Sequence, residues 1–165
     1  MMIRLEKPDD VAAIGDVVRR AFGNNAEADL IDRLRGDGDL LLSLVAEQDG
    51  QVLGHIGFSR LRIVQNGRSI PAVSLAPLSV TPDRQRQGIG RALVEAGHAR
   101  LRQMGETIVF VLGDPSYYHH FGFSLSAAAV FECLYAGSHF QALRLASSAP
   151  DIGLVTYASA FSDLG

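Results

Sequence analysis

The sequence contains a single cysteine, Cys133, among its 165 residues. A lone thiol excludes an intramolecular disulfide and fits a reducing compartment, so we expect a cytoplasmic protein. There is no run of 18 apolar residues, and the start, Met-Met-Ile-Arg-Leu-Glu, lacks the apolar segment of a signal peptide. Internal repeats and linker-like stretches are also lacking. We therefore expect no membrane partner, and we predict one domain over residues 1–165.

Positive charge is scarce as well. The chain has 15 Lys and Arg against 18 Asp and Glu, a formal net charge of -3. This balance argues against a general nucleic-acid binder, because such proteins carry a basic face. Hydrophobic residues make up 47% and charged residues 20%, which is typical of a globular domain.

Arginine and glycine gather in one stretch, Val80-Thr-Pro-Asp-Arg-Gln-Arg-Gln-Gly-Ile-Gly-Arg-Ala-Leu93. An apolar strand pattern precedes it and an amphipathic helix pattern follows it. Gly88 and Gly90 let backbone amides point into a concave turn, and the helix start adds unpaired amides and the positive end of its dipole. The arginines around the turn are Arg84, Arg86 and Arg91. The stretch therefore predicts a phosphate or pyrophosphate site at a helix N-terminus.

Two common phosphate-binding motifs do not fit this turn. The P-loop pattern fails because no lysine follows Gly90, and the dinucleotide pattern fails because Leu93 stands where its third glycine is required. The pattern that does fit is Q/R-x-x-G-x-G/A, here Gln85-Arg-Gln-Gly88-Ile-Gly90. Together with Leu78-Ser-Val80 before it, this stretch resembles the GNAT superfamily of acetyl-CoA-dependent acyltransferases. The plainer alternative is a glycine-containing turn with solvated arginines.

A second stretch supports the same resemblance. Many GNAT proteins have a short helix ending in Y-x-x-x-G-F after the fifth strand, and Tyr118-His-His-Phe-Gly122-Phe123 matches it. Asp114 or Ser116 can begin this helix, with Pro115 in its first turn. In the family this helix usually contains an asparagine, and here Gly113-Asp-Pro115 replaces that version of the helix.

The order of elements predicts an α/β fold of the GNAT type. Its mixed, mostly antiparallel sheet would have a parallel pair of fourth and fifth strands and flanking helices. Pro77 within the fourth strand predicts a bulge or an edge, and in the family the pantetheine arm lies between these two strands. We expect strands at residues 2–5, 40–47, 51–64, 69–80, 107–112, 130–135 and 152–157, and helices at 8–22, 26–35 and 88–104.

The resemblance implies transfer of an acetyl group from acetyl-CoA, a cosubstrate, to an amine by direct attack on the thioester. In the family the amides of residues 86–91 hold the pyrophosphate, and a free amide near Leu78 or Ser79 would polarise the thioester carbonyl. The coenzyme contacts implied are Leu78, Ser79, Val80, Gln85, Arg86, Gln87, Gly88, Ile89, Gly90, Arg91, Ser116 and Tyr118.

Tyr118 is the candidate general acid for the departing thiolate, because a phenol stays protonated at neutral pH. The alternative is a tyrosine that only packs against the sheet. Candidate general bases are Glu27 and Glu47, with His55 as a third choice.

No metal is expected. His119 and His120 are adjacent, so we expect them to point in different directions on a helix, and they lack partners at zinc spacing. Cys133 lies in a strand-like segment and reads as a buried, inert thiol rather than a nucleophile.

Two other functions use the same residues. A non-catalytic acyl-CoA-binding or sensor module would keep the glycine turn and tolerate loss of Tyr118. A nucleotide-binding regulator would bind ADP as well as CoA. The acceptor amine is not identified by the sequence, and exposed strand edges make a homodimer a further expectation.

Overall fold

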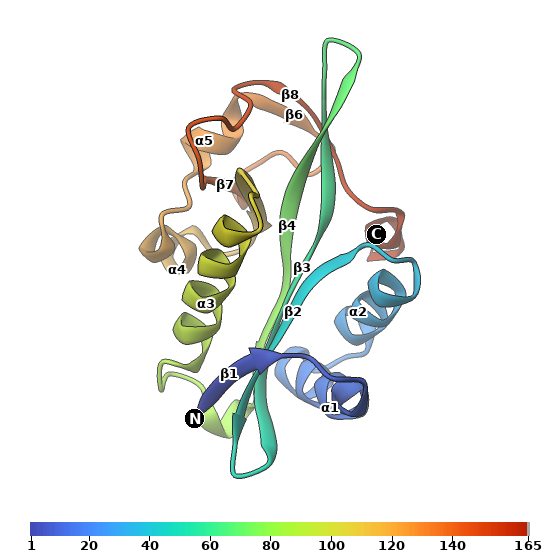
Figure 1. Cartoon of the computed structure of the whole chain (residues 1–165), viewed down its shortest axis with the longest axis vertical. Coiled ribbons are helices and arrows are strands. Elements are labelled where there is room, and N and C mark those ends of the chain that lie inside the picture. The colour runs from blue at the N-terminus through green and yellow to red at the C-terminus, as the bar shows by residue number, and fades with distance from the viewer. Residues whose placement is uncertain (165) are drawn as a thin grey trace. The chain divides into compact units, whose positions relative to one another are not determined.

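The computed structural model describes residues 1–164, with side chains described for residues 1–162. It has an α/β fold in which hydrogen-bonded strands follow the order β1-β2-β3-β4-β5-β7, with β8 paired to β3 and β6 to β8 (Figure 1). The strands are β1 (Met2–Leu5), β2 (Leu40–Gln48), β3 (Gln51–Gln65), β4 (Arg68–Val80), β5 (Ile108–Leu112), β6 (Phe131–Cys133), β7 (Phe140–Arg144) and β8 (Gly153–Thr156). The α-helices are α1 (Val11–Phe22), α2 (Ala26–Gly36), α3 (Ile89–Gln103), α4 (Pro115–Tyr118) and α5 (Leu125–Ala129). Short 3₁₀ segments are η1 (Pro8–Asp10), η2 (Pro82–Arg84), η3 (His119–Phe121) and η4 (Ser159–Leu164).

The described chain forms two compact units. Unit 1 comprises residues 1–59, 76–97 and 159–164, and unit 2 comprises residues 60–75 and 98–158. Strands β3 and β4 and helix α3 each run from one unit into the other. The single-domain organisation stays a prediction.

Unit 1 contains two antiparallel strand pairs, β1 with β2 and β2 with β3. The second pair is joined by the turn at Asp49 and Gly50, which both have positive φ as a tight hairpin turn requires. Helices α1 and α2 lie next to these strands (Figure 1). A buried cluster of Ile14, Val18, Ala28 and Val45 joins both helices to β2, because the apolar stripe of each helix faces the strand.

Two glycines of β3 allow helices to approach unit 1 from both sides. A Cβ at Gly54 would lie 3.1 Å from Leu93 of α3, and one at Gly57 would lie 2.9 Å from Ile31 of α2. Residues 54 and 57 are three apart in a strand, so they point to opposite faces. The β3 face that carries Gly57 therefore lies under α2, and the other face lies under the first half of α3.

Unit 2 is built around β5. Val73–Leu75 of β4 pair in parallel with β5, which confirms the predicted crossover, and β5 also pairs antiparallel with β7. The ring of Phe110 stacks at 5.3 Å on Phe140 and meets Phe131 edge-on at 5.2 Å. These aromatic contacts centre the core of this unit on β5.

The sequence analysis missed β7 and α5. The predicted strands at 130–135 and 152–157 are present as β6 and β8, but they pair in parallel with each other, and β8 pairs with the end of β3. The strand that flanks β5 is the unpredicted β7. Residues 108–111 of β5 are buried, whereas Leu112 at the end of the strand is 41% exposed. No helix in the described part of the chain is long and apolar enough to cross a membrane.

Candidate active site

The predicted anion turn lies in unit 1, between β4 and α3. Arg86 and Gly88 both have left-handed backbone, with φ of 64° and 86°. The first backbone bond of α3 runs from the amide of Ala92 to the carbonyl of Gly88, at 3.0 Å. The amides of Ile89, Gly90 and Arg91 therefore precede the helix ladder, as the first amides of any helix do. This turn has the backbone geometry of an anion site at a helix N-terminus.

Side chains fix the entry to this turn. The Nε2 of Gln85 donates to the carbonyl of Val80 at 3.0 Å, which closes the turn back onto the end of β4. The amide of Thr81 donates to the carbonyl of Leu53 at 2.8 Å and anchors the turn to β3. Ile89 is buried, whereas Gln87 and Gly88 are exposed. The turn is thus held at both ends while its middle faces solvent.

The three arginines differ in their surroundings. Arg91 is exposed, and its Nε donates to Oε1 of Glu95 at 2.9 Å, one helical turn later. Arg86 is exposed in the left-handed position of the turn, and Arg84 is half-buried at the end of η2. Arg84 and Arg86 therefore precede α3, whereas Arg91 lies on the helix and pairs with its own Glu95.

The end of β4 supplies Leu78, Ser79 and Val80. Pairing with β5 ends at Leu75 and Val111, and the Ala76–Pro77 peptide that follows is cis. β4 continues as one strand to Val80. The hydroxyl of Ser79 is buried and has no hydrogen-bond partner. The predicted bulge or edge at Pro77, and the slot for a pantetheine arm, stay predictions.

Tyr118 lies in unit 2, in the short helix α4. Asp114 begins this helix: its carboxylate accepts a hydrogen bond from the amide of Ser116 at 2.9 Å and another from the Ser116 hydroxyl at 2.8 Å. Of the two predicted caps, Asp114 is therefore the one used, and Ser116 is its exposed partner. Gly122, with φ of 95°, ends the segment, as the motif predicts.

The ring of Tyr118 is held by close packing. A Cβ at Gly113 would lie 2.5 Å from Cε2 of Tyr118, so only glycine leaves room for the ring. Phe123 meets it edge-on with centroids 5.7 Å apart, and Tyr117 lies at 5.1 Å. Burial raises the pKa of Tyr118, and the neighbouring Tyr117 adds to the shift. The phenol therefore stays protonated at neutral pH.

Gln141 is a buried polar residue near this helix that the sequence analysis missed. It lies on β7 with no exposed surface, and its Nε2 donates to the carbonyl of Gly113 at 3.1 Å. It thereby fixes the glycine against which Tyr118 packs. Because β7 was not predicted, nothing in the sequence pattern placed Gln141 next to residue 113.

The expectation that the side chains of His119 and His120 point in different directions was wrong. Their ring centroids are 4.1 Å apart, with an interplanar angle of 36°. The two residues lie where α4 passes into the 3₁₀ segment η3, and their side chains turn toward each other there. Among the described residues, no group of three or more His, Cys, Asp and Glu is placed to hold a metal ion.

Cys133 is half-buried rather than buried. Its sulfur accepts a hydrogen bond from the amide of Tyr135 at 3.4 Å. Burial raises the pKa of the Cys133 thiol, and the bond from Tyr135 opposes this only in part. The thiol is thus protonated at neutral pH, as expected for an inert cysteine.

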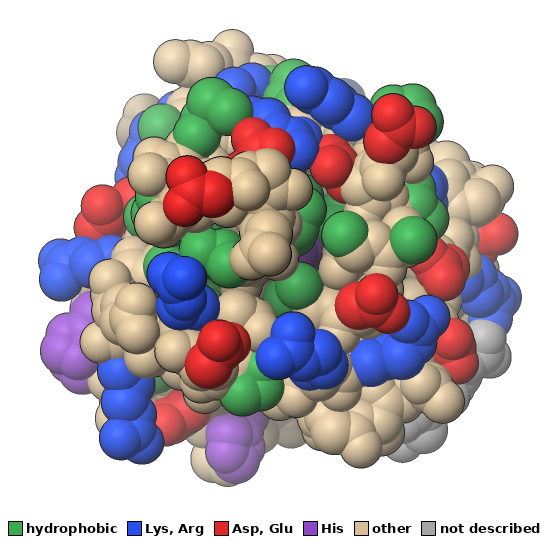
Figure 2. All heavy atoms as spheres, turned by 90° about the horizontal axis from the view of Figure 1, so that it is seen from below, with side chains coloured by type: hydrophobic (Ala, Val, Ile, Leu, Met, Phe, Trp, Pro, Cys, Tyr) green, Lys and Arg blue, Asp and Glu red, His purple; other side chains and the backbone are tan. Residues whose placement is uncertain are grey.

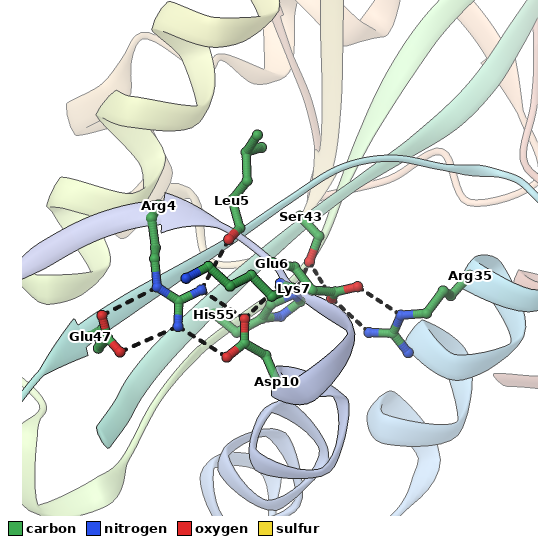
Figure 3. Close-up of polar contacts among 9 residues, drawn as sticks. All are labelled: Arg4, Leu5, Glu6, Lys7, Asp10, Arg35, Ser43, Glu47 and His55. Atoms are coloured by element: carbon green, nitrogen blue, oxygen red, sulfur yellow. Dashed lines mark hydrogen bonds and ion pairs between the residues drawn. The ribbon is translucent and has the colours of Figure 1, made fainter. Parts of the chain in front are cut away.

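Of the two candidate bases, Glu47 has a structural partner. The Nε of Arg4 donates to its Oε2 at 3.2 Å, and the same guanidinium pairs with Asp10 at 2.7 Å (Figure 3). The hydrogen bonds from Arg4 hold the pKa of Asp10 below its usual value. Glu27, in the first turn of α2, differs: its Oε2 is buried and has no hydrogen-bond partner.

His55 belongs to a chain of polar side chains that the sequence analysis did not foresee (Figure 3). Its Nε2 lies 2.8 Å from the hydroxyl of Ser43, which lies 2.7 Å from Oε1 of Glu6. Arg35 of α2 donates to both oxygens of Glu6, at 2.7 and 2.9 Å. His55 has no exposed surface, and burial lowers its pKa to about 4.

The buried His55 makes stability depend on pH. Its pKa falls from 6.5 in the unfolded chain to about 4 in the folded one. Between these values the unfolded chain binds the proton and the folded protein does not, so the free energy of unfolding falls as the pH falls from 6.5 toward 4. The expected loss is roughly 3 kcal/mol over that range. Urea unfolding at several pH values should show this slope, and His55→Gln should reduce it to the part contributed by His98, whose pKa burial also lowers to about 4. An unchanged slope would show that His55 does not contribute to it.

The charged side chains of unit 1 do not form a field of one sign. A hollow of about 490 Å³ is lined by carboxylates and arginines together, among them Asp9, Asp16, Arg20 and Arg84. On the face drawn in Figure 2, basic and acidic side chains likewise alternate. The hollow therefore carries charges of both signs.

Comparison with known proteins gives a consistent result. Residues 2–126 match the family model described as an acetyltransferase (GNAT) domain. The chain is 41% identical over 167 residues to a relative from Escherichia coli strain K12 described as "Uncharacterized N-acetyltransferase YhbS", covering 98% of this chain and 99% of that protein.

Two solved structures are similar over nearly the whole chain. One is the Escherichia coli YhbS protein in complex with CoA, with a TM-score of 0.91, 40% identity and coverage of 99% of this chain and 93% of that chain. The other is a GNAT family acetyltransferase from Brucella melitensis in complex with acetyl-CoA, with a TM-score of 0.82, 41% identity and coverage of 97% of each chain.

Proposed function

The chain belongs to the GNAT acetyltransferase family, and on this premise we propose that it transfers the acetyl group of acetyl-CoA to the amine of an acceptor. The observation that carries the proposal is the turn at residues 85–91, where left-handed backbone at Arg86 and Gly88 leads directly into α3. The similar structures with bound CoA and acetyl-CoA support this choice of coenzyme.

The residues of the turn fit a pyrophosphate. The amides of Ile89, Gly90 and Arg91 lie at the positive end of a helix of 15 residues, where an anion is stabilised. Gln85 is occupied with the carbonyl of Val80, so we assign its side chain to shaping the turn. Exposed Arg86 is our candidate for a charge contact with a coenzyme phosphate.

The reaction needs no covalent enzyme intermediate, because a thioester is already activated. The amine nitrogen attacks the carbonyl carbon, an N–C bond forms, the C–S bond breaks, and the amine loses a proton while the thiolate gains one. We assign to the phenol of Tyr118 the donation of the proton that the thiolate gains. A backbone amide of Leu78 or Ser79 at the end of β4 would stabilise the oxyanion, as hydrogen-bond donors do in acyl transfer.

Glu27 is a better candidate than Glu47 for contact with the acceptor. Glu47 is neutralised by Arg4, and that ion pair holds β1 to β2. The buried, unpartnered Oε2 of Glu27 calls for a cationic or N–H donor, because such an atom is costly to leave unpaired. An acceptor ammonium supplies both on binding, and it must lose one proton to solvent before the neutral amine can attack.

The proposal also covers the cell compartment and the oligomeric state of the protein. The half-buried, protonated Cys133 fits the reducing cytoplasm. We also propose a homodimer, because strand edges are exposed; equilibrium sedimentation that finds only monomer would remove this part.

The experiment that tests the transferase is release of CoA thiol from acetyl-CoA in the presence of individual amines. We expect a subset of amines to accelerate release saturably, with the acetylated amine visible by mass spectrometry. A non-catalytic acyl-CoA module predicts binding of acetyl-CoA with no acetylated product from any amine. That outcome would contradict the proposal.

A further inference from the structure

The hydrogen-bond chain at His55 determines which ring nitrogen carries the proton. The carboxylate of Glu6 can only accept, so the hydroxyl of Ser43, 2.7 Å away, must donate to it. The Ser43 oxygen can then only accept from the nitrogen 2.8 Å away, so Nε2 of His55 carries the hydrogen. The ring is neutral in this arrangement, and its Nδ1 presents a lone pair.

Glu6 is ionised despite its surroundings. Burial alone would raise the pKa of Glu6, but the hydrogen bonds from Arg35 and Ser43 outweigh it and hold this pKa below its usual value. The charged groups that face His55 are thus Glu6, which precedes η1, and Arg35 of α2. The negative charge lies one hydroxyl away from the ring, and the positive charge lies beyond it (Figure 3).

The Nδ1 atom of His55 is the unusual feature. His55 has no exposed surface, and its Nδ1 has no hydrogen-bond partner in the structure. Buried side-chain acceptors are normally paired, because one left unpaired is costly. A base held in one tautomer with a free lone pair is a typical arrangement for accepting a proton.

The neighbouring strand places Ser79 opposite His55. The amide of Thr81 donates to the carbonyl of Leu53 at 2.8 Å, which fixes the register of β4 against β3 at one end. A Cβ at Gly57 would lie 3.4 Å from Cδ of Pro77, which gives the same register four residues along. His55 and Ser79 stand halfway between these two contacts.

Residues opposite one another on antiparallel strands project to the same face, with Cβ atoms about 4.5–5.5 Å apart. Ser79 is only 2% exposed, and its hydroxyl also has no hydrogen-bond partner. Two neighbouring side chains of one face thus carry an unused acceptor and an unused hydroxyl. Rotation about χ1 of Ser79, which has three staggered positions, is the change that would bring them together.

We propose that His55 receives the proton of the attacking amine through the hydroxyl of Ser79, and that Ser43 and Glu6 hold its ring in the required tautomer. The inference rests on the proposed acetyl transfer. As the N–C bond forms, the amine N–H proton passes to the Ser79 oxygen, and the Ser79 proton passes to Nδ1. The products are the amide, a neutral serine and an imidazolium whose Nε2–H remains bonded to Ser43.

Burial and charge agree with this role. The lowered pKa keeps His55 deprotonated at neutral pH, so the lone pair is available before each turnover. The charge of Glu6 favours the imidazolium formed afterwards, while Arg35 disfavours it. His55 therefore takes up a proton only transiently, as a relay requires. Ser79 contacts the acceptor, and His55 is a positioning and proton-accepting residue behind it.

The tautomer can be measured without any acceptor. In protein labelled with ¹⁵N-histidine, long-range ¹H–¹⁵N spectra should show His55 with hydrogen on Nε2 and a bare Nδ1 at neutral pH. Ser79→Ala should shift the Nδ1 resonance, and Ser59→Ala should not. Ser59 is the matched control, because it is a fully buried serine of β3 whose hydroxyl is likewise unpartnered. A hydrogen on Nδ1, or an Nδ1 chemical shift that Ser79→Ala leaves unchanged, would overturn the proposal.

The kinetic test uses whichever amine gives the fastest CoA release, or water as nucleophile if no amine does. His55→Gln keeps an amide that can bond to Ser43 but removes the basic nitrogen. We expect it and Ser79→Ala each to lower kcat by about a hundredfold, with unchanged acetyl-CoA affinity and a kcat that rises with pH as solvent hydroxide replaces the base. Ser59→Ala should keep both wild-type rate and pH profile. If both variants retain kcat within twofold, the relay is wrong although acetyl transfer stands. If acetyl-CoA affinity falls by the same factor as kcat, the two residues have a structural role and the relay is also wrong.

Discussion

Gly88→Val is expected to weaken acetyl-CoA binding by roughly 30- to 150-fold, or about 2–3 kcal/mol. Nothing lies within 4 Å of the Cβ position of Gly88, so the effect comes from backbone strain rather than a clash. Its φ is 86°, in a region where an L-residue is disfavoured by about 1–2 kcal/mol and a β-branched one by more. Relief of this strain would turn the amides that follow away from the phosphate position. Calorimetric titration of the variant with acetyl-CoA measures the effect.

Gly105→Val is the matched control for this variant. Gly105 follows the other end of α3, has φ of 84°, and also has open space at its Cβ position. The same backbone strain arises there without any change in the anion turn. We expect similar losses of thermal stability in both variants and a loss of acetyl-CoA affinity in Gly88→Val alone. Equal affinities in the two variants would contradict the assignment of the turn.

Tyr118→Phe is expected to lower kcat by about 10²- to 10³-fold, the range of a general acid, while acetyl-CoA affinity stays within twofold. The substitution removes only the hydroxyl, and the ring contacts with Gly113 and Phe123 remain. The rate of CoA release at saturating acetyl-CoA and amine measures the effect.

Tyr117→Phe provides the comparison for the neighbouring ring. Tyr117 contacts Tyr118 edge-on and is 37% exposed, so its own hydroxyl has no assigned role. Its removal should leave kcat near the wild-type value. Wild-type turnover in Tyr118→Phe would show that this tyrosine only packs against its neighbours.

The sequence predicted those parts of the fold that local chemistry determines. The short connection between the predicted strands 40–47 and 51–64 and the end of the helix predicted at 88–104 follow from turn and cap preferences of Asp49, Gly50 and Gly105 that act over a few residues. Strand β7 is different. Its segment, Phe-Gln-Ala-Leu-Arg, has weak alternation, and pairing with β5 rather than propensity makes it a strand.

In the candidate site, too, the contiguous motifs were predictable and the contacts made by tertiary structure were not. The glycine turn and the tyrosine helix are contiguous motifs, so their chemistry can be read along the chain. The chain from Arg35 through Glu6 and Ser43 to His55 joins four separate elements or connections, and only the register of the strands brings these residues together. The close packing of Gly113 on Tyr118, and the bond from Gln141 that supports it, likewise depend on tertiary structure.

The most direct test of the account is calorimetric titration of the wild-type protein with acetyl-CoA, with ADP and free pantetheine as controls. We expect saturable, tight binding of acetyl-CoA and much weaker binding of either control, because the turn and the end of β4 are assigned to different parts of one coenzyme. Equal binding of ADP and acetyl-CoA, or binding of none of the three, would contradict the assignment of coenzyme A to this protein.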